Sequence, residues 1–214
     1  MAPDLSETPD LLRRFREGDA QALAALFTRY RERLRRMVRL RLDRRLHGRV
    51  DPSDVLREAY VDVSQRAGEY NTNPSLPFFL WLRQVTGQRL QALHQKHLGA
   101  PLRDAGQEVS LYRGALPQAN SVSLAAQLLG RSASPSQAAA RAEKQIRLQE
   151  ALNGMDPLDR EVLTLRHFEE LSNSETAAIL GIPKAEASNH YIRALKRLKD
   201  ILGSMPGFFD QSRG

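Results

Sequence analysis

The 214-residue sequence contains no cysteine and no long hydrophobic run, and aromatic residues make up only 6% of it. Without cysteine, disulfide bonds and thiolate metal ligands are excluded. No apolar run approaches the roughly 18 to 20 residues that a membrane-spanning helix needs. The first residues also lack the charged head and apolar stretch of a secretion signal. We therefore expect a soluble, cytoplasmic protein.

Alternation of apolar and polar residues, the pattern typical of a β-strand, never persists long enough to predict one. Helical spacing dominates, so the predicted fold class is all-α. The length suits one large domain or two small ones, and we favour two small helical domains, 9–98 and 137–204. The segment between them, 99–136, is rich in Gly, Ala, Ser and Pro and predicts a flexible linker, with a short helix at 123–130.

Positive charge is in excess, since 32 Lys and Arg residues outnumber 25 Asp and Glu residues. Residues 29–49 hold ten arginines against two acidic residues, so this segment accounts for the whole excess. A basic chain favours a polyanionic partner. Apolar residues within 9–46 recur at helical steps and predict one amphipathic helix, or two joined near Gly18. The arginines around it either contact phosphates or form a solvated face whose stems cover apolar surface.

A helix with a clear start signal is predicted from Asp51. Asp51 can cap it, Pro52 suits the first helical position, and Asp54 lies in the first turn, where the helix dipole favours negative charge. A catalytic or metal-binding cluster of this helix's acids is the minor alternative. No histidine stands at ligand spacing, so we expect no catalytic residue, no metal and no cofactor.

The segment 71–77 combines asparagines and prolines, which predict an irregular loop. The helix after it begins with Phe78, Phe79 and Trp81 and continues with basic residues. Aromatic side chains beside a basic helix can stack on unpaired bases. The alternative, which we favour for Trp81, is that these rings belong to the core.

Residues 171–202 predict a helix, a glycine turn and a second helix. Ser172 and Glu175 have the spacing of a capping box. Gly181 tolerates the positive φ of a turn, and small or apolar residues stand where the helices meet: Ala177, Ile182, Ala187 and Tyr191. This layout is typical of a helix-turn-helix that places its second helix in the DNA major groove, although a helical hairpin without a DNA role uses similar residues.

Three stretches resemble the bacterial sigma-70 family of transcription initiation factors: "DPSDVLREAYVDV", "PFFLWLRQV" and "MDPLDREVLTLRHFEELSNSETAAILGIP". Their order is similar to that of the extracytoplasmic-function (ECF) class, which keeps only regions 2 and 4. The resemblance covers nearly all of 11–202. It implies a factor without chemistry of its own that binds core RNA polymerase, at the β′ clamp and the β flap, and promoter DNA. An anti-sigma protein is a further partner that it allows.

The resemblance also implies three sets of site residues. Polymerase binding falls to Asp54, Arg57, Glu58, Tyr60 and Val61. Binding of the minus-10 element falls to Tyr70, Asn71, Asn73, Phe78 and Gln88, with the loop from Tyr70 to Leu76 capturing a flipped base. Binding of the minus-35 element falls to Lys184, Glu186, Ser188, Asn189, Arg193, Lys196 and Arg197. Arg57 departs from the family's usual glutamine, and the loop is slightly longer than usual.

The head of the last helix, "KAEASNHY", is weakly basic, since Ser188, Asn189 and His190 stand where the family commonly has lysine or arginine. Our hypothesis is that this head reads bases, Asn189 being suited to adenine, while Arg193 and the basic residues after it bind phosphates.

Two other functions stay open. A helix-turn-helix repressor or activator needs no polymerase-binding domain. A DNA-processing enzyme such as a recombinase needs a nucleophile or a carboxylate constellation, which the sequence does not supply.

Overall fold

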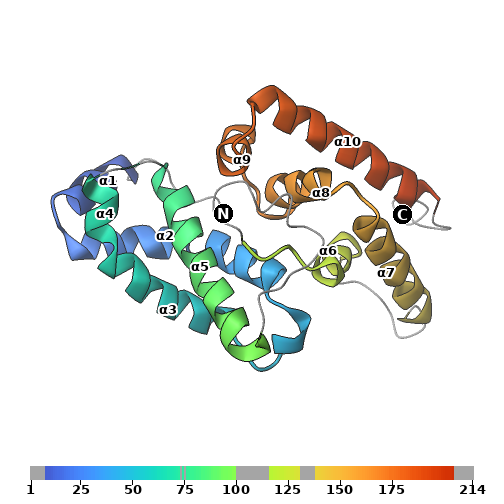
Figure 1. The fold of residues 1–214 in the computed structure, drawn as a ribbon, viewed down its shortest axis with the longest axis horizontal. Helices are drawn as coiled ribbons and strands as arrows, with labels where there is room; N and C mark the ends of the chain where they lie inside the picture. The colour runs from blue at the N-terminus through green and yellow to red at the C-terminus, as the bar shows by residue number, and fades with distance from the viewer. Residues whose placement is uncertain (1–7, 73, 75, 100–115, 131–137, 205–214) are drawn as a thin grey trace, which may run out of the picture. The chain divides into compact units, whose positions relative to one another are not determined.

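The computed structural model describes residues 8–72, 74, 76–99, 116–130 and 138–204. Every regular element within these ranges is helical, which confirms the all-α class (Figure 1). The chain divides into two compact units, Met1–Leu102 and Arg103–Gly214. In the described part of the chain, no helix is long and apolar enough to cross a membrane.

The first unit begins with two helices, α1 (Thr8–Arg16) and α2 (Ala20–Arg41). The chain turns between them at Gly18, whose φ of 91° is unstrained only for glycine. Asp19 caps α2 by accepting hydrogen bonds from two backbone N–H groups of its first turn, and it also accepts two from Arg14 (3.0 and 2.7 Å). Of the two alternatives for this segment, two helices joined near Gly18 is therefore correct.

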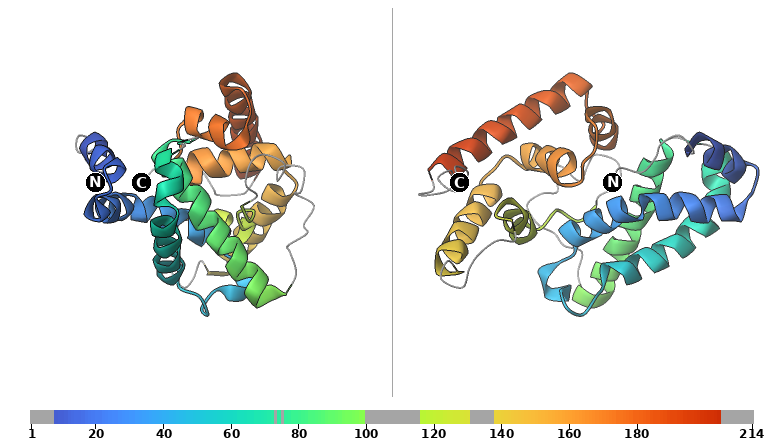
Figure 2. Two further views of the ribbon diagram at one scale, coloured as in Figure 1. Left: turned by 60° about the vertical axis from the view of Figure 1, so that its left-hand side comes forward. Right: turned by 180° about the vertical axis from the view of Figure 1, so that it is seen from behind.

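Two further long helices, α3 (Pro52–Gln65) and α5 (Phe78–Leu98), pack against α2 and against each other (Figure 2). The 3-10 turn η2 (Arg44–Leu46) lies between α2 and α3. Asp51 caps α3 by accepting from the Ser53 N–H (2.7 Å), as its start signal predicted. Apolar residues of α3 are buried in this bundle: Val55, Leu56, Ala59 and Val63.

The expected irregular loop, 71–77, begins instead as a helix, so this prediction was wrong at its start. Helix α4 spans Ala67–Thr72 and includes both Tyr70 and Asn71. Asn73 lies outside the described residues. Asparagine is a weak helix former, but the Tyr70 ring is 5% exposed, and burying an aromatic ring stabilises the turn by more than the propensity of one residue costs.

An aromatic cluster fills the first unit where α1, α2, α4 and α5 meet. The ring centroids of Tyr70 and Trp81 are 4.8 Å apart, and those of Phe15 and Phe78 are 5.3 Å apart. Aromatic pairs in such geometry contribute about 0.5–1.5 kcal/mol each beyond the area they bury. Trp81 is 7% exposed, which confirms its assignment to the core.

The second unit contains five α-helices in the described ranges: α6 (Ser121–Leu128), α7 (Ala138–Asn153), α8 (Pro157–Leu163), α9 (Asn173–Leu180) and α10 (Lys184–Gly203). Asp156 caps α8, and Pro157 occupies its first position. After α8 the chain continues into the π-helical turn η5 (Thr164–Phe168). Leu148, Leu152, Val162 and Leu165 are fully buried and form the centre of this unit's core.

Part of the segment expected to be a flexible linker is folded. The predicted short helix is present as α6, and its Leu124 and Ala125 are fully buried. The guanidinium of Arg160 donates to the carbonyl of Ala119 (2.6 Å), which holds the entry to α6. Residues 116–130 therefore belong to the second unit, because α6 packs on α7.

The turn between α9 and α10 follows the local signals of the sequence. Ser172 accepts from the Glu175 N–H (3.1 Å), and Glu175 accepts from the Ser172 N–H (2.7 Å), which completes the capping box. Gly181 ends α9 with a φ of 67°. The Ile182 N–H donates back to the Ala177 carbonyl (3.2 Å), a closure that satisfies a carbonyl at the helix end.

Candidate nucleic-acid interface

Among the described residues, helix α10 packs against the rest of its unit through one face. Its buried residues are Ala187, His190, Ala194 and Leu198. They recur at helical spacing, so they form one stripe, and α10 packs with it against α8 and α9 (Figure 1). On the rest of α10, Ser188 is half-buried, and the other residues expected at the minus-35 element are exposed: Lys184, Glu186, Asn189, Arg193, Lys196 and Arg197.

Side-chain contacts fix the start of α10 relative to α9. The Asn173 amide donates to the Lys184 carbonyl (2.8 Å) and accepts from Arg166 (2.8 Å). The same guanidinium lies 4.5 Å from the centroid of the Tyr191 ring. The first residues of the two helices are thereby joined, which sets the direction in which α10 leaves the turn.

A buried carboxylate on α8 fixes the middle of α10. Asp159 Oδ1 lies 2.5 Å from His190 Nδ1, and both side chains are almost completely buried. Arg193 donates to both carboxylate oxygens of Asp159, with Nη2 2.8 Å from Oδ1 and Nε 3.1 Å from Oδ2. Glu186 lies one turn earlier, with its Oε1 3.6 Å from His190 Nε2. Two successive turns of α10 are thus attached to a single residue of α8.

Burial alone would raise the pKa of Asp159, but hydrogen bonds and charge from Arg193 and His190 outweigh it, and this pKa lies below its ordinary value. The hydrogen bond to Asp159, followed by its charge, raises the pKa of Arg193. At neutral pH the carboxylate is therefore ionised and the attachment between α8 and α10 is complete.

The structure separates His190 from the rest of the helix head that was expected to read bases. His190 is 9% exposed and belongs to the packing of α10, whereas Asn189 is exposed. The Arg193 side chain is 58% exposed but already bonded to Asp159. A phosphate contact by Arg193 stays a prediction, and the exposed cations that follow it on α10 are Lys196, Arg197 and Lys199.

Asp156, Asp159 and His190 are the one group of three potential metal ligands among the described residues, with ligand atoms within 4.8 Å of one another. Asp156 Oδ1 already accepts from the N–H groups of Leu158 and Asp159. The guanidinium of Arg193 supplies the positive charge beside Asp159. This group therefore has a structural role as a helix cap and a helix-to-helix attachment.

The exposed side of α3 carries the residues expected to bind polymerase. Asp54 and Arg57 form an ion pair on this surface (2.6 Å), with Glu58 on the following turn. Val61 is 51% exposed, whereas the Tyr60 ring is half-buried and packs edge-on against Phe27, 5.1 Å between centroids. Four of the five expected residues therefore share an accessible surface.

Arg89 of α5 binds the acids at the end of this surface. It donates through Nε to Asp62 Oδ2 (2.6 Å) and lies 3.6 Å from Glu58 Oε2. The hydrogen bond to Asp62 raises the pKa of Arg89. The acids of α3 thus have structural partners, since Asp51 caps the helix and Asp54 pairs with Arg57.

The residues expected at the minus-10 element are mostly covered. Tyr70 and Phe78 are each 5% exposed, and burial raises the pKa of Tyr70. Asn71 is half-buried and donates to the Phe15 carbonyl (3.4 Å). Gln88 is the exposed member of the four that the structure describes, and its Oε1 accepts from Arg66 (2.6 Å).

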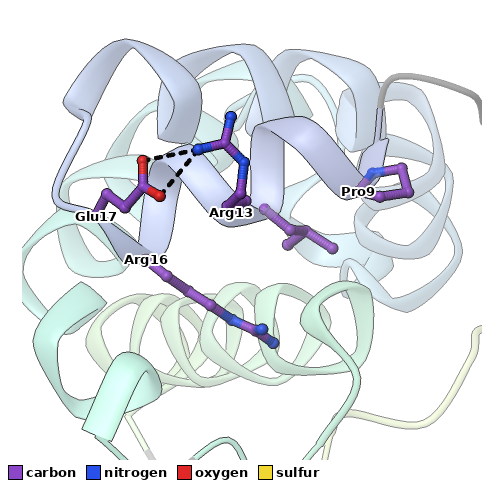
Figure 3. A pocket seen from close by; sticks show the side chains of 5 residues that line it. Pro9, Arg13, Arg16 and Glu17 are labelled. Carbon is purple, nitrogen blue, oxygen red and sulfur yellow. Dashed lines mark hydrogen bonds and ion pairs between the residues drawn. The ribbon is translucent and has the colours of Figure 1, made fainter.

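The arginines of α1 and α2 serve packing and pairing in several places. On α1, a shallow hollow is lined by Pro9, Leu12, Arg13, Arg16 and Glu17. Figure 3 shows Arg13 bonded to Glu17 (2.9 Å), while Arg16 projects away from that pair. On α2, the guanidinium of Arg33 lies 3.7 Å from the centroid of the Phe79 ring. These contacts agree with the interpretation that arginine stems cover apolar surface.

Comparison with known proteins decides the family. The family model described as Sigma-70, region 4, matches residues 145–198. RNA polymerase sigma factor CarQ from Myxococcus xanthus is 24% identical over 196 residues, which cover 91% of this chain and 97% of CarQ. The chain belongs to the sigma-70 family. The ECF class inferred from the order of segments is confirmed with it, as is a sigma-factor function in transcription initiation.

Two more comparisons agree with the assignment of this sigma factor. RNA polymerase sigma-E factor from Streptomyces antibioticus is 40% identical over 55 residues, 26% of this chain and 31% of that protein. The structure of CnrH in complex with the cytosolic domain of CnrY has the same fold, with a TM-score of 0.52 and 20% identity. That match covers 91% of the sigma factor and 96% of the solved chain.

The attachment of α10 through Asp159 was missed in the sequence of this sigma factor. One signal was present, because His190 lies three residues after Ala187 and four before Ala194, within the apolar stripe of the helix. Nothing local identifies its partner, since Asp159 lies 31 residues earlier.

Proposed function

We propose that this sigma factor recruits core RNA polymerase through its first unit and recognises the minus-35 element with α10. The observation that carries the proposal is the one-sided attachment of α10: His190 and its stripe bind α8, while Asn189 and Lys196 are exposed. The DNA major groove admits a single α-helix presented in this way. The factor supplies binding energy for strand opening, and the polymerase makes the RNA.

The polymerase contact is proposed on the exposed side of α3, against the β′ clamp, with a second contact between the second unit and the β flap. Val61 is half-exposed among the charged residues Asp54, Arg57 and Glu58. An apolar residue within a charged rim is typical of a protein interface. The half-buried Tyr60 is proposed to contribute the edge of its ring.

Contact with the minus-10 element is proposed through Gln88, which is exposed on α5. Tyr70 and Phe78 are covered by Phe15 of α1, whose ring centroid lies 6.2 Å and 5.3 Å from theirs. They would reach an unstacked base only after α1 moves. Asn71 would become available after the same movement, because its side-chain amide donates to the Phe15 carbonyl.

The cytoplasm is the proposed location, because promoters and core polymerase are found there. CnrH binds the cytosolic domain of CnrY in its solved structure. A comparable protein partner, an anti-sigma protein, is proposed for this factor as well.

Transcription in vitro tests the proposal. The full chain is combined with core RNA polymerase and genomic fragments, and the RNA products are mapped. Transcripts from defined start sites that appear only with the chain support a sigma factor. DNA binding without such transcripts would instead indicate a repressor or activator, and cleavage of supercoiled DNA would indicate a recombinase.

Asn189→Ala is expected to relax base preference at one position of the minus-35 element, because an amide side chain pairs with adenine through two hydrogen bonds worth about 1–3 kcal/mol of discrimination. Lys196→Ala is expected to weaken binding to all DNA sequences alike. It should also reduce the salt dependence of binding by about the amount due to one phosphate contact. Holoenzyme affinity for promoter and scrambled duplexes at several salt concentrations measures both.

The two variants serve as controls for each other, since Asn189 and Lys196 are both exposed on α10. Equal losses on promoter and scrambled DNA in Asn189→Ala would contradict a base-reading role for this residue.

A further inference from the structure

An exposed isoleucine lies in the middle of the outward side of α10. Ile192 is 50% exposed. Single exposed aliphatic residues are common on protein surfaces, so the position of this one decides its meaning. Asn189 lies one turn before it and Lys196 one turn after it, and both are exposed. Ile192 is therefore the apolar centre of the surface proposed to enter the major groove.

The attachment of α10 fixes the direction in which Ile192 points. His190 is bonded to Asp159 of α8 (2.5 Å), and the fully buried Ala194 lies on the same side of the helix. Each residue of an α-helix advances by about 100° around the axis. Ile192 therefore lies about 200° around the helix from His190, on the side opposite α8. Loosening the Asp159 contact would let this direction drift.

The charges around Ile192 identify the occupant of this surface as DNA. Lys196 and Lys199 follow it at one and two turns, and both are exposed. An apolar protein partner would leave these ammonium groups without compensation, whereas a phosphate backbone binds them.

Only one base offers an isoleucine a specific contact in the major groove. The side chain has no hydrogen-bond donor or acceptor, so it cannot distinguish bases by their polar edges. Thymine alone presents a methyl group there, on C5. We propose that Ile192 is a specificity-determining residue that contacts the C5-methyl group of a thymine in the minus-35 element. This inference rests on the proposed minus-35 role of α10.

The position of the thymine follows from helix geometry. Three residues of an α-helix rise about 4.5 Å, and successive base pairs are about 3.4 Å apart. Ile192 is three residues after Asn189. The thymine therefore belongs to the base pair next to the one that Asn189 reads.

Removing only the methyl group tests the contact. Promoter duplexes defined by transcription in vitro are synthesised with each thymine of the minus-35 element replaced singly by deoxyuridine. Holoenzyme assembled with the full chain is then titrated with each duplex. The wild-type factor is expected to lose about fourfold in affinity at one position, the factor that corresponds to burial of one methyl-sized group.

Two variants locate the contact on the protein. Ile192→Ala is expected to bind the thymine and deoxyuridine duplexes equally well at that position. Leu195→Ala is the matched control, because Leu195 is also an exposed aliphatic residue of α10, at 37%, but lies about 60° around the helix from Ile192. It is expected to keep the fourfold preference. Circular dichroism spectra matching the wild type show that both variants are folded.

Each remaining outcome overturns the inference in a recognisable way. Defined transcripts together with indifference to every deoxyuridine substitution would refute the methyl contact and leave the proposed function intact. Loss of the preference in Leu195→Ala but not in Ile192→Ala would show that Leu195, and not Ile192, makes the contact. If no fragment gave defined transcripts, the proposed function itself would be refuted, and the inference with it.

Discussion

Replacing Phe78 with alanine is expected to lower the free energy of unfolding of the first unit by about 3–5 kcal/mol, the usual cost of removing a buried phenylalanine ring. Phe78 is 5% exposed, and its ring contacts those of Phe15 (5.3 Å), Tyr70 (5.4 Å) and Trp81 (5.6 Å). Small domains are stable by only about 5–15 kcal/mol, so the first unit would lose a large part of its stability.

Urea denaturation followed by tryptophan fluorescence measures this loss selectively, because Trp81 is the single tryptophan of the chain and belongs to the same cluster. Val61→Ala is the control: it also shortens an apolar side chain, but one that is 51% exposed, and its effect should stay within about 0.5 kcal/mol. A urea midpoint of Phe78→Ala equal to that of the wild type would mean that the Phe78 ring lies at the surface, where it can contact a base.

The helices whose starts depend on neighbouring residues could be predicted from the sequence. Two helices of the structure begin with an Asp-Pro pair, at Asp51-Pro52 and at Asp156-Pro157. In each pair the aspartate supplies a capping oxygen, and the proline has no N–H that needs a hydrogen-bond partner. Chemistry confined to a few consecutive residues is visible without knowledge of the fold. The start and the glycine end of α9 are predictable for the same reason.

The covering of the aromatic cluster could not be predicted, because it depends on residues distant in the chain. Phe15 of α1 packs on Tyr70, 55 residues later. Composition suggested an irregular loop at Asn71, but the packing of Tyr70 holds this segment in α4. The same contacts explain why Tyr70 and Phe78, two of the expected minus-10 residues, are buried in the structure.

The exposure of most candidate minus-35 residues was predictable, whereas their individual contacts were not. Helical spacing separates an inner from an outer side of α10, which correctly makes Asn189 and Lys196 exposed. It does not reveal that Arg193, exposed by the same pattern, is bonded to a carboxylate of another helix. Ion pairs between helices depend on tertiary packing, so the pairing of Asp159 with Arg193 appears only in the structure.

Asp159→Ala is expected to destabilise the second unit by about 2–3 kcal/mol, because hydrogen bonds to a charged group are lost and a buried histidine is left without its partner. The loss should appear in the urea dependence of circular dichroism at 222 nm, a wavelength at which helix content is read, and not in Trp81 fluorescence, which reports the first unit. Asp200→Asn removes a negative charge from an exposed position of α10 and should leave stability within about 0.5 kcal/mol.

Asp159 also makes the stability of the second unit depend on pH under acidic conditions. Its folded pKa lies below its ordinary value, so its stabilising contribution is complete above the unfolded pKa of about 3.9 and disappears as the pH falls through the lower folded pKa. The stability of the second unit should therefore depend less steeply on pH below about 4 in Asp159→Asn than in the wild type. Identical acid profiles would show that Arg193 and His190 do not stabilise the ionised form.

A positioning role for Asp159 predicts a further effect that lost stability alone does not. At a temperature where Asp159→Asn remains folded, α10 should retain its cations but not its fixed orientation about its own axis. Affinity for promoter duplexes should then fall while affinity for scrambled DNA persists, because phosphate contacts tolerate rotation of the helix and base contacts do not. Equal effects on both duplexes would contradict the positioning role and leave Asp159 with a contribution to stability alone.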